Sequence, residues 1–331
     1  MKFSVVIPTS RPTTLGAAIR SIQAQTATDW ELLVVGQGPS EPIREIVEAI
    51  SERDARVQYL HLDQRGSSRA RNAGIRAASG DIIALTDDDG QARADWLAVL
   101  MRSLADEPEV AVVGGALIAP PASGVRPARC PELIPAEALY DPVASKRRPP
   151  AGWDWIGANV AIRREIAEQV GEWDEHLGVG SEFPSAGDTD YKLRLEALGF
   201  KMRSTPRAVV DHTYGWRTGF KAVLALQRSQ ARGLGALAAK LTMIGDPRGT
   251  EWLRMWWRDR LLRWLRQREP QRLASDLRIL WHFCNGYRTC LANYRVDARG
   301  LLVKFPDLRV AQGSSGVAWE KGLLPRDLTS H

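Results

Sequence analysis

Three consecutive carboxylates, Asp87, Asp88 and Asp89, follow an apolar run that ends at Leu85. Like charges repel one another, and the end of a buried strand is a costly place for them. A solvated turn would offset that cost without any chemistry. A divalent cation would offset it by binding carboxylate oxygens together with phosphate oxygens and water. Asp87 and Asp89 are two residues apart, so in an extended segment they project to the same side.

Two other residues have types suited to chemistry. Asp188 lies at the start of a predicted helix, where it could be a general base or simply the N-cap of that helix. His212 follows the apolar run Ala208–Val210, and a neutral imidazole is a suitable ligand for Mn²⁺. A lone histidine is more often structural, so the residue types leave both alternatives open at each position.

Alternating strands and helices predict where these residues lie. Five short apolar strands are expected in the first 115 residues, with amphipathic helices between them: Phe3–Ile7, Glu31–Val35, Val57–Leu62, Asp81–Leu85 and Val110–Val113. This order predicts an α/β fold, with a Rossmann-like, mostly parallel sheet covered by helices on both faces. Ligands of such sheets bind at the carboxyl ends of strands, which is where Asp87–Asp89 and Pro8–Arg11 lie.

The rest of the chain has a different composition. The proline-rich stretch Pro120–Pro150 predicts a long loop, and strand and helix patterns return between residues 151 and 215. From Trp216 onward the predicted helices are rich in Arg and Trp. We therefore expect an α/β domain at residues 1–215, with halves at 1–115 and 151–215 around a loop at 120–150, and a C-terminal helical extension at 216–331.

Composition limits the function classes. The chain has 331 residues, 44% of them hydrophobic and 25% charged, which is typical of a globular protein. Its net charge of +6 favours anionic partners such as nucleotide phosphates, nucleic acid or an acidic lipid surface. Three cysteines without a CxxC pair favour a reducing compartment. The start, MKFSVVIP, is typical of a strand rather than a signal peptide, so we expect a cytoplasmic protein.

Residues 251–266, EWLRMWWRDRLLRWLR, predict a basic amphipathic helix with tryptophans on its apolar side. Such a helix fits a peripheral contact with the inner face of the cell membrane. The alternative is that the apolar stripe packs on the α/β domain or on a second subunit, which would make a homo-oligomer. Both alternatives stay open.

An ordered series of motifs resembles the family 2 glycosyltransferases, which are inverting enzymes with the GT-A fold. The motifs are VIPT, ARNAG, GDIIALTDDD, GANVAIRR, GEWDE and GDTDYKLRL, and they span roughly residues 1 to 215. The resemblance implies transfer of a sugar from a nucleotide-diphosphate donor to a hydroxyl of a saccharide or lipid-linked acceptor. It also implies Mn²⁺ or Mg²⁺ as cofactor and a role in polysaccharide or cell-envelope synthesis.

The resemblance assigns a role to each matching residue. Asp188 corresponds to the general base, Asp89 to the metal ligand and His212 to a residue that completes the metal site. The donor-binding positions are Pro8, Thr9, Arg11, Gln37, Arg71, Asn72, Asp87 and Asp88. The acceptor-binding positions are Gly157, Ala158 and Asn159, and Trp155 beside them could stack on a sugar or lie in the core.

Two departures from the family pattern keep other functions open. Gln37 follows the second strand where the family usually has an acid, and Gly187 precedes Asp188 where the family has a glutamate, a charge that Glu182 could supply. A non-catalytic sugar-nucleotide binder is therefore the main alternative. A nucleotidyltransferase is a less favoured alternative, because no Gly-rich phosphate loop follows the first strand. A nucleic-acid-binding protein is also less favoured, because the acidic residues would have no role in it.

Overall fold

The computed structural model describes residues 1–121, 124, 127–213, 215–267 and 270–305. The chain forms two compact units. The first comprises Met1–Trp173 and Tyr191–Val223, and the second comprises Asp174–Asp190 and Leu224–His331. A single division near residue 215 does not describe this arrangement, because residues 174–190 belong with the C-terminal helices.

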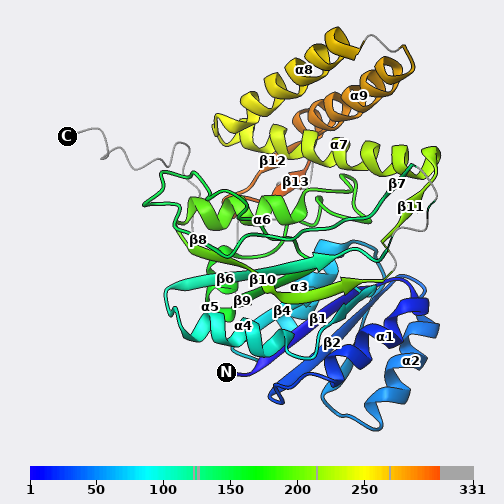
Figure 1. Cartoon of the computed structure of the whole chain (residues 1–331), viewed down its shortest axis with the longest axis vertical. Helices are drawn as coiled ribbons and strands as arrows, with labels where there is room; N and C mark the ends of the chain where they lie inside the picture. The colour runs from blue at the N-terminus through cyan, green and yellow to red at the C-terminus, as the bar shows by residue number, and fades with distance from the viewer. Residues whose placement is uncertain (122–123, 125–126, 214, 268–269, 306–331) are drawn as a thin grey trace. The chain divides into compact units, whose positions relative to one another are not determined.

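The first unit is built on a nine-stranded, mostly parallel sheet, as the sequence predicts (Figure 1). Its strand order is β3-β2-β1-β4-β9-β6-β10-β5, with β8 paired to β10. Strand β9 runs antiparallel between β4 and β6. The strands are β1 (Phe3–Thr9), β2 (Trp30–Gln37), β3 (Val57–Leu62), β4 (Ile82–Thr86), β5 (Gly90–Ala92), β6 (Val110–Ile118), β8 (Ala138–Tyr140), β9 (Asn159–Arg163) and β10 (Lys201–His212).

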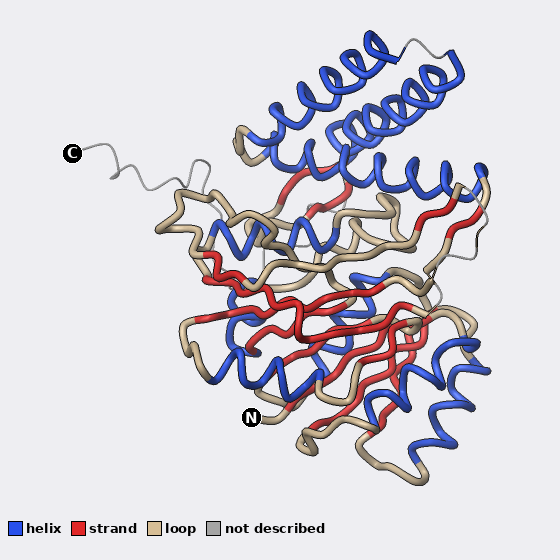
Figure 2. Tube along the Cα trace, in the orientation of Figure 1, coloured by secondary structure: helices blue, strands red, loops and turns tan. Residues whose placement is uncertain are grey.

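Helices cover both faces of this sheet (Figure 2). Neighbouring residues of a strand point to opposite faces, and so Val5 packs in one buried cluster while Val6 packs in the other. The first cluster includes residues of α1 (Pro12–Gln23), α2 (Glu41–Ser51) and α4 (Trp96–Ala105). The second includes residues of α3 (Ser67–Ala77), α5 (Arg164–Val170) and α6 (Gly187–Ala197).

The predicted loop at 120–150 is partly regular. Strand β7 (Ala128–Arg129) pairs with β11 (Arg217–Thr218), and β8 joins the central sheet through β10. An isolated bridge also joins Leu133 to Leu117 of β6. These pairings were not predicted, because two- and three-residue strands leave no hydrophobic period in the sequence.

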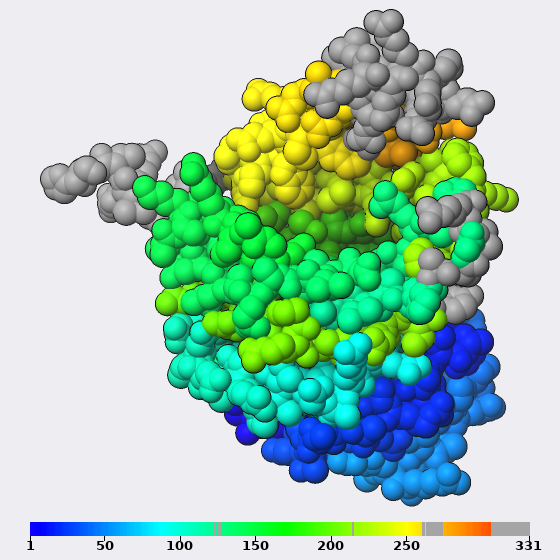
Figure 3. Space-filling view, in the orientation of Figure 1, coloured from blue at the N-terminus to red at the C-terminus, as the bar shows by residue number. Residues whose placement is uncertain are grey.

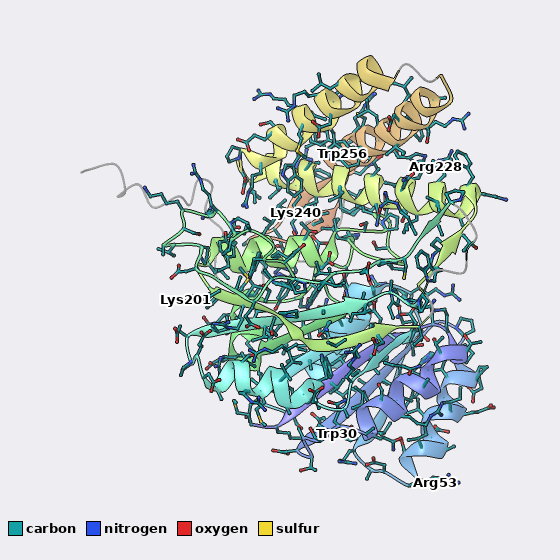
Figure 4. The ribbon with its side chains drawn as sticks, viewed as in Figure 1. Trp30, Arg53, Lys201, Arg228, Lys240 and Trp256 are labelled. Carbon is teal, nitrogen blue, oxygen red and sulfur yellow. The ribbon has the colours of Figure 1, made fainter. Side chains whose placement is uncertain are left out.

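The second unit contains α7 (Phe220–Met243) from Leu224 onward, α8 (Arg248–Gln267), α9 (Pro270–Asn293) and a hairpin of β12 (Tyr294–Val296) and β13 (Leu302–Lys304). Helix α8 lies at the surface of this unit, in yellow in Figure 3. Trp256 of α8 stacks on Phe283 of α9 with ring centroids 4.5 Å apart; Figure 4 labels Trp256 and also Lys240 of α7. A Cβ on Gly286 would lie 2.1 Å from the Arg232 carbonyl, so glycine lets α9 approach α7 closely. Of the helices in the described part of the chain, none is long and apolar enough to cross a membrane.

Candidate active site

Asp87, Asp88 and Asp89 occupy the tight turn between β4 and β5. Every residue of β4 is buried, so the turn begins at the edge of the core. The side chains of Asp88 and Asp89 are each only 6% exposed, whereas that of Asp87 is 39% exposed. The turn closes on Gly90, where a Cβ would lie 2.7 Å from Val210 and leave no room for a larger residue. The carboxylates are therefore held against β10 rather than projecting into solvent.

Two arginines offset the repulsion between these carboxylates. Nη2 of Arg11 lies 2.6 Å from Asp88 Oδ1 and 2.8 Å from Asp89 Oδ2, and Thr9 donates a hydrogen bond of 2.8 Å to Asp88. Nη2 of Arg71 lies 3.3 Å from Asp87 Oδ1. Desolvation raises the pKa of Asp87 against the effect of Arg71, even though part of its side chain is exposed. The carboxylates are thus already partly neutralised by protein groups.

His212 meets Asp89 across the sheet, because His212 of β10 pairs in register with Gly90 of β5. Its Nε2 lies 3.4 Å from Asp89 Oδ1, and its Nδ1 lies 3.1 Å from the carbonyl oxygen of Pro131. Burial lowers the pKa of His212, but Asp89 outweighs that effect and the pKa is raised. Burial likewise raises the pKa of Asp89, but His212 and Arg11 outweigh it and lower the pKa.

Arg71 is held in place by three neighbours. Its guanidinium lies over the ring of Trp173, 4.9 Å from the ring centroid, and beside the Asp87 carboxylate. A Cβ on Gly157 would come within 2.9 Å of Arg71 Nη2, so this glycine makes room for the guanidinium. Asn72 exchanges hydrogen bonds of 2.8 and 2.9 Å with the backbone of Trp173. The ARN motif of α3 is thereby tied to the GEWDE motif a hundred residues later.

Other predicted site residues make structural contacts. Asn159 is fully buried; its amide donates to the carbonyls of Ala116 and Ala208, and its oxygen accepts from Trp96 Nε1. Trp155 is also fully buried, with Lys192 Nζ 5.1 Å from its ring centroid.

Two more donor-side residues and one acceptor-side residue are buried as well. Gln37 accepts a hydrogen bond of 2.7 Å from the Gly66 amide. Pro8 is buried within β1, and Ala158 is buried beside Gly157. Several predicted site residues thus hold backbone segments or line the core in this structure.

Asp188 belongs to the second unit, in the first turn of α6. Its Oδ1 accepts a hydrogen bond of 2.8 Å from the Thr189 amide, and the side chain is partly exposed. Ala186, two residues earlier, has a φ of 70°, a left-handed conformation that is unusual for a residue with a Cβ. Glu182 is engaged by Tyr294 at 2.6 Å and Lys304 at 3.2 Å, so its carboxylate is committed to the β12–β13 hairpin.

A buried ion cluster near Asp188 was not predicted. Lys240 Nζ lies 2.7 Å from Asp174 Oδ2 and 2.5 Å from Asp190 Oδ1, all within the second unit. Cys130 and Pro131 beside His212 were also missed, since they lie in the irregular stretch 120–150. Asp174 and Asp190 belong to the GEWDE and GDTDYKLRL motifs, but nothing local to either motif indicates Lys240, which is 66 residues from Asp174.

Comparisons with known proteins agree on a family. A sequence model described as Glycosyl transferase family 2 matches residues 4–171. The chain is 27% identical over 230 residues to a glucosyl-dolichyl phosphate glucuronosyltransferase of Haloferax volcanii, covering 66% of this chain and 72% of that protein. It is 34% identical over 121 residues to a GalNAc(5)-diNAcBac-PP-undecaprenol beta-1,3-glucosyltransferase of Campylobacter jejuni, covering 35% of this chain and 38% of that one.

The fold is similar to that of solved glycosyltransferases. The mannosyltransferase PcManGT from Pyrobaculum calidifontis, solved in complex with GDP-Man and Mn²⁺, superposes with a TM-score of 0.56 and 16% identity over 87% of each chain. The family model covers just over half of the chain, including the Asp87–Asp89 turn and the ARN motif. The chain therefore belongs to glycosyl transferase family 2 and is a glycosyltransferase with the GT-A fold.

Proposed function

We propose that this chain transfers a sugar from a nucleotide-diphosphate donor to a hydroxyl of a saccharide or lipid-linked acceptor, with inversion at the anomeric carbon and with Mn²⁺ or Mg²⁺ as cofactor. The observation that carries the proposal is the turn Asp87–Asp89, with Arg11, Arg71 and His212 gathered around it. Carboxylates and cations side by side suit a ligand that brings both a metal ion and phosphates.

Asp89 and His212 are the proposed metal ligands. Donation of Nδ1–H from His212 to the Pro131 carbonyl turns Nε2 toward Asp89, and Nε2 would bind the metal ion once its proton has left. In the described residues no group of three or more His, Cys, Asp or Glu side chains could hold a metal. Donor phosphates and water would therefore complete the coordination. A divalent cation held there would neutralise charge on the departing diphosphate, and the Mn²⁺ in the PcManGT complex supports this choice.

The donor contacts are proposed to come from both arginines and from the strand ends. Arg71 is rigidly placed by Gly157 and Trp173, so it would bind a phosphate at little cost in side-chain entropy. Arg11 is 38% exposed and reaches Asp88 and Asp89. Thr9, next to it, holds Asp88 by a hydrogen bond. The remaining donor residues, Pro8, Gln37 and Asn72, would act by holding the backbone segments around the nucleotide.

Asp188 is the proposed general base. It would accept the proton of the acceptor hydroxyl while that oxygen forms a bond to the anomeric carbon and the bond from that carbon to the diphosphate oxygen breaks. The first turn of a helix favours its ionised form. The left-handed Ala186 just before this helix supports the proposal, because backbone strain is concentrated at functional sites.

The acceptor class and location are also proposals. Two relatives act, by name, with dolichyl-phosphate-linked or undecaprenol-linked sugars, which supports a lipid-linked acceptor. Such an acceptor lies in a membrane, so we propose that the protein works at the inner face of the cell membrane through a peripheral contact of its C-terminal helices, in the synthesis of a cell-envelope glycan.

A panel of nucleotide sugars tests the proposal. The melting temperature of the protein should rise with the correct donor and rise further with Mn²⁺ or Mg²⁺, because ligands that bind the folded state stabilise it. Asp89→Asn should lose the metal-dependent part of the shift. Asp188→Asn should keep the whole shift but lose transfer by about 10²–10⁴-fold. Wild-type transfer by Asp188→Asn would refute its role, and donor binding without transfer to any acceptor would favour a non-catalytic binder.

A further inference from the structure

The positive charge of this chain is concentrated in two helices. The whole chain has a net charge of +6, and α8 and α9 together contain nine arginines and three carboxylates, which is also a net charge of +6. The remainder of the chain is therefore balanced between acids and bases. Four of these arginines, at positions with described side chains, are exposed: Arg254, Arg258, Arg278 and Arg288. A surface with this charge attracts anions.

The same helices expose large apolar side chains. Trp257 is 54% exposed, Leu277 54% and Trp281 61%. Leu277 and Trp281 are four residues apart on α9, and Cys284 follows three residues later on the same face. Trp257 of α8 comes beside this stripe, because its neighbour Trp256 stacks on Phe283, the residue before Cys284, with ring centroids 4.5 Å apart. The exposed rings and arginines thus form one surface, here called the Trp/Arg surface: Arg254, Trp257, Leu277, Arg278, Trp281 and Arg288.

This exposure is not forced by the fold of the unit. Trp252, Leu253 and Trp256 of α8 already pack against the cluster that contains Phe283. Trp257 is the next residue along the helix, is 54% exposed and is not among the residues of that cluster. A contiguous exposed apolar patch of this kind is typical of a surface that binds a partner or a membrane.

We propose that the Trp/Arg surface docks on a bilayer that contains anionic lipids. Indole rings are favoured at the level of the lipid headgroups, the aliphatic Leu277 gains from contact with acyl chains, and the arginines pair with lipid phosphates. Helix α8 lies at the surface of its unit (Figure 3). The proposal deepens the peripheral contact proposed above and rests on it.

Two other occupants fit less well. A second copy of the chain, related by a twofold axis, would place this arginine-rich surface against itself, and like charges repel. The phosphates of a nucleic acid would neutralise the charge of the arginines, but a nucleic acid offers no apolar environment for the Leu277 side chain. An anionic bilayer supplies both the charge and the apolar layer.

Flotation with lipid vesicles tests the proposal on the full chain. Phosphatidylcholine vesicles are compared with vesicles that also contain phosphatidylglycerol, for the wild type, the double variant W257A/W281A and the double variant R254Q/R288Q. Each double variant should bind the anionic vesicles about tenfold more weakly. Phe220→Ala is the matched control, since Phe220 is an aromatic residue with 64% exposure outside this surface, and it should bind like the wild type.

Several outcomes would overturn the proposal. These are equal binding to vesicles without phosphatidylglycerol, wild-type binding by W257A/W281A, or a wild-type dimer that dissociates in W257A/W281A. Quenching of tryptophan fluorescence by brominated lipid gives a second measurement, and it should be weaker in W257A/W281A. The thermal shift with the nucleotide-sugar donor is measured on the same variants. Loss of vesicle binding with an intact donor shift supports the docking surface, and failure of the transferase proposal would leave the vesicle result unchanged.

Discussion

Lys240 neutralises two buried carboxylates in the second unit, and its replacement by methionine tests how much that unit depends on the ion cluster. Its ammonium nitrogen lies 2.7 Å from Asp174 and 2.5 Å from Asp190, and the three side chains are 1–3% exposed. Methionine fills a similar volume but supplies no charge. Removing one partner of a buried ion pair costs about 3–5 kcal/mol, so we expect the free energy of unfolding to fall by about that amount.

A second substitution separates charge from packing. In the double variant K240M/D190N, only one of the two carboxylates remains charged. Asp174 keeps two backbone donors, the amides of His176 at 3.1 Å and Leu302 at 2.9 Å. We therefore expect the double variant to regain about 1–3 kcal/mol relative to Lys240→Met. The matched control is Lys304→Met, whose lysine is 49% exposed and pairs with Glu182, and which should cost about 0–1 kcal/mol.

Urea unfolding followed by circular dichroism measures all four proteins. A loss of less than about 1 kcal/mol for Lys240→Met, or a double variant less stable than the single one, would refute the reasoning. Asp190 lies two residues after Asp188 in α6. If Asp188 is the base, Lys240→Met should also lower kcat for transfer more than it changes KM for the donor.

Three further substitutions test the first unit. Glu31 has a pKa of about 2 instead of 4.5, because hydrogen bonds from Ser4 and Ser79 outweigh its desolvation. The ionised Glu31 should therefore add about 2–3 kcal/mol to the free energy of unfolding. This contribution should be complete above pH 4.5 and should vanish as the pH falls to about 2. Thermal unfolding across pH should thus show Glu31→Gln to be less stable than the wild type at neutral pH but not in strong acid. Asn159→Ala should lower the free energy of urea unfolding by about 2–4 kcal/mol, because it leaves two carbonyls and an indole N–H buried without their partner; an effect below about 0.5 kcal/mol would contradict this. Gly157→Ala should displace the Arg71 guanidinium and weaken donor binding about tenfold by calorimetry, and unchanged affinity would show that Arg71 does not contact the donor.

The strands and the acidic turn were predictable because each leaves a local signal. Phe3–Ile7 is an apolar run with two valines and an isoleucine, and Val57–Leu62 has alternating apolar residues; the structure has strands at Phe3–Thr9 and Val57–Leu62. The carboxylates of Asp87–Asp89 follow a buried strand, and the expectation that they and Pro8–Arg11 lie at strand ends agrees with the 2.6 Å contact between Arg11 and Asp88. Both predictions depend only on residues that are close together in the sequence.

Contacts between distant residues could not be predicted in the same way. Nothing local shows that β9 inserts between β4 and β6, or that His212 lies in register with Gly90. The burial of Asn159 follows from that insertion, and for this reason an amide expected near the acceptor makes three hydrogen bonds inside the sheet. Charge pairing was equally hidden, since Asp174 and Lys240 are 66 residues apart.

The division of the chain into two interleaved units restricts where recombination with related sequences could join segments without breaking a unit. The chain passes from one unit to the other after Trp173, after Asp190 and after Val223, and the last two crossings lie inside the helices α6 and α7. A recombination event near residue 215 would pair the Asp174–Asp190 segment with foreign helices that need not offer a counterpart to Lys240. Chimaeras with relatives of different acceptor range should therefore carry residues 174–190 and the C-terminal helices together, so that the segment holding Asp188 is inherited with the helices that anchor it.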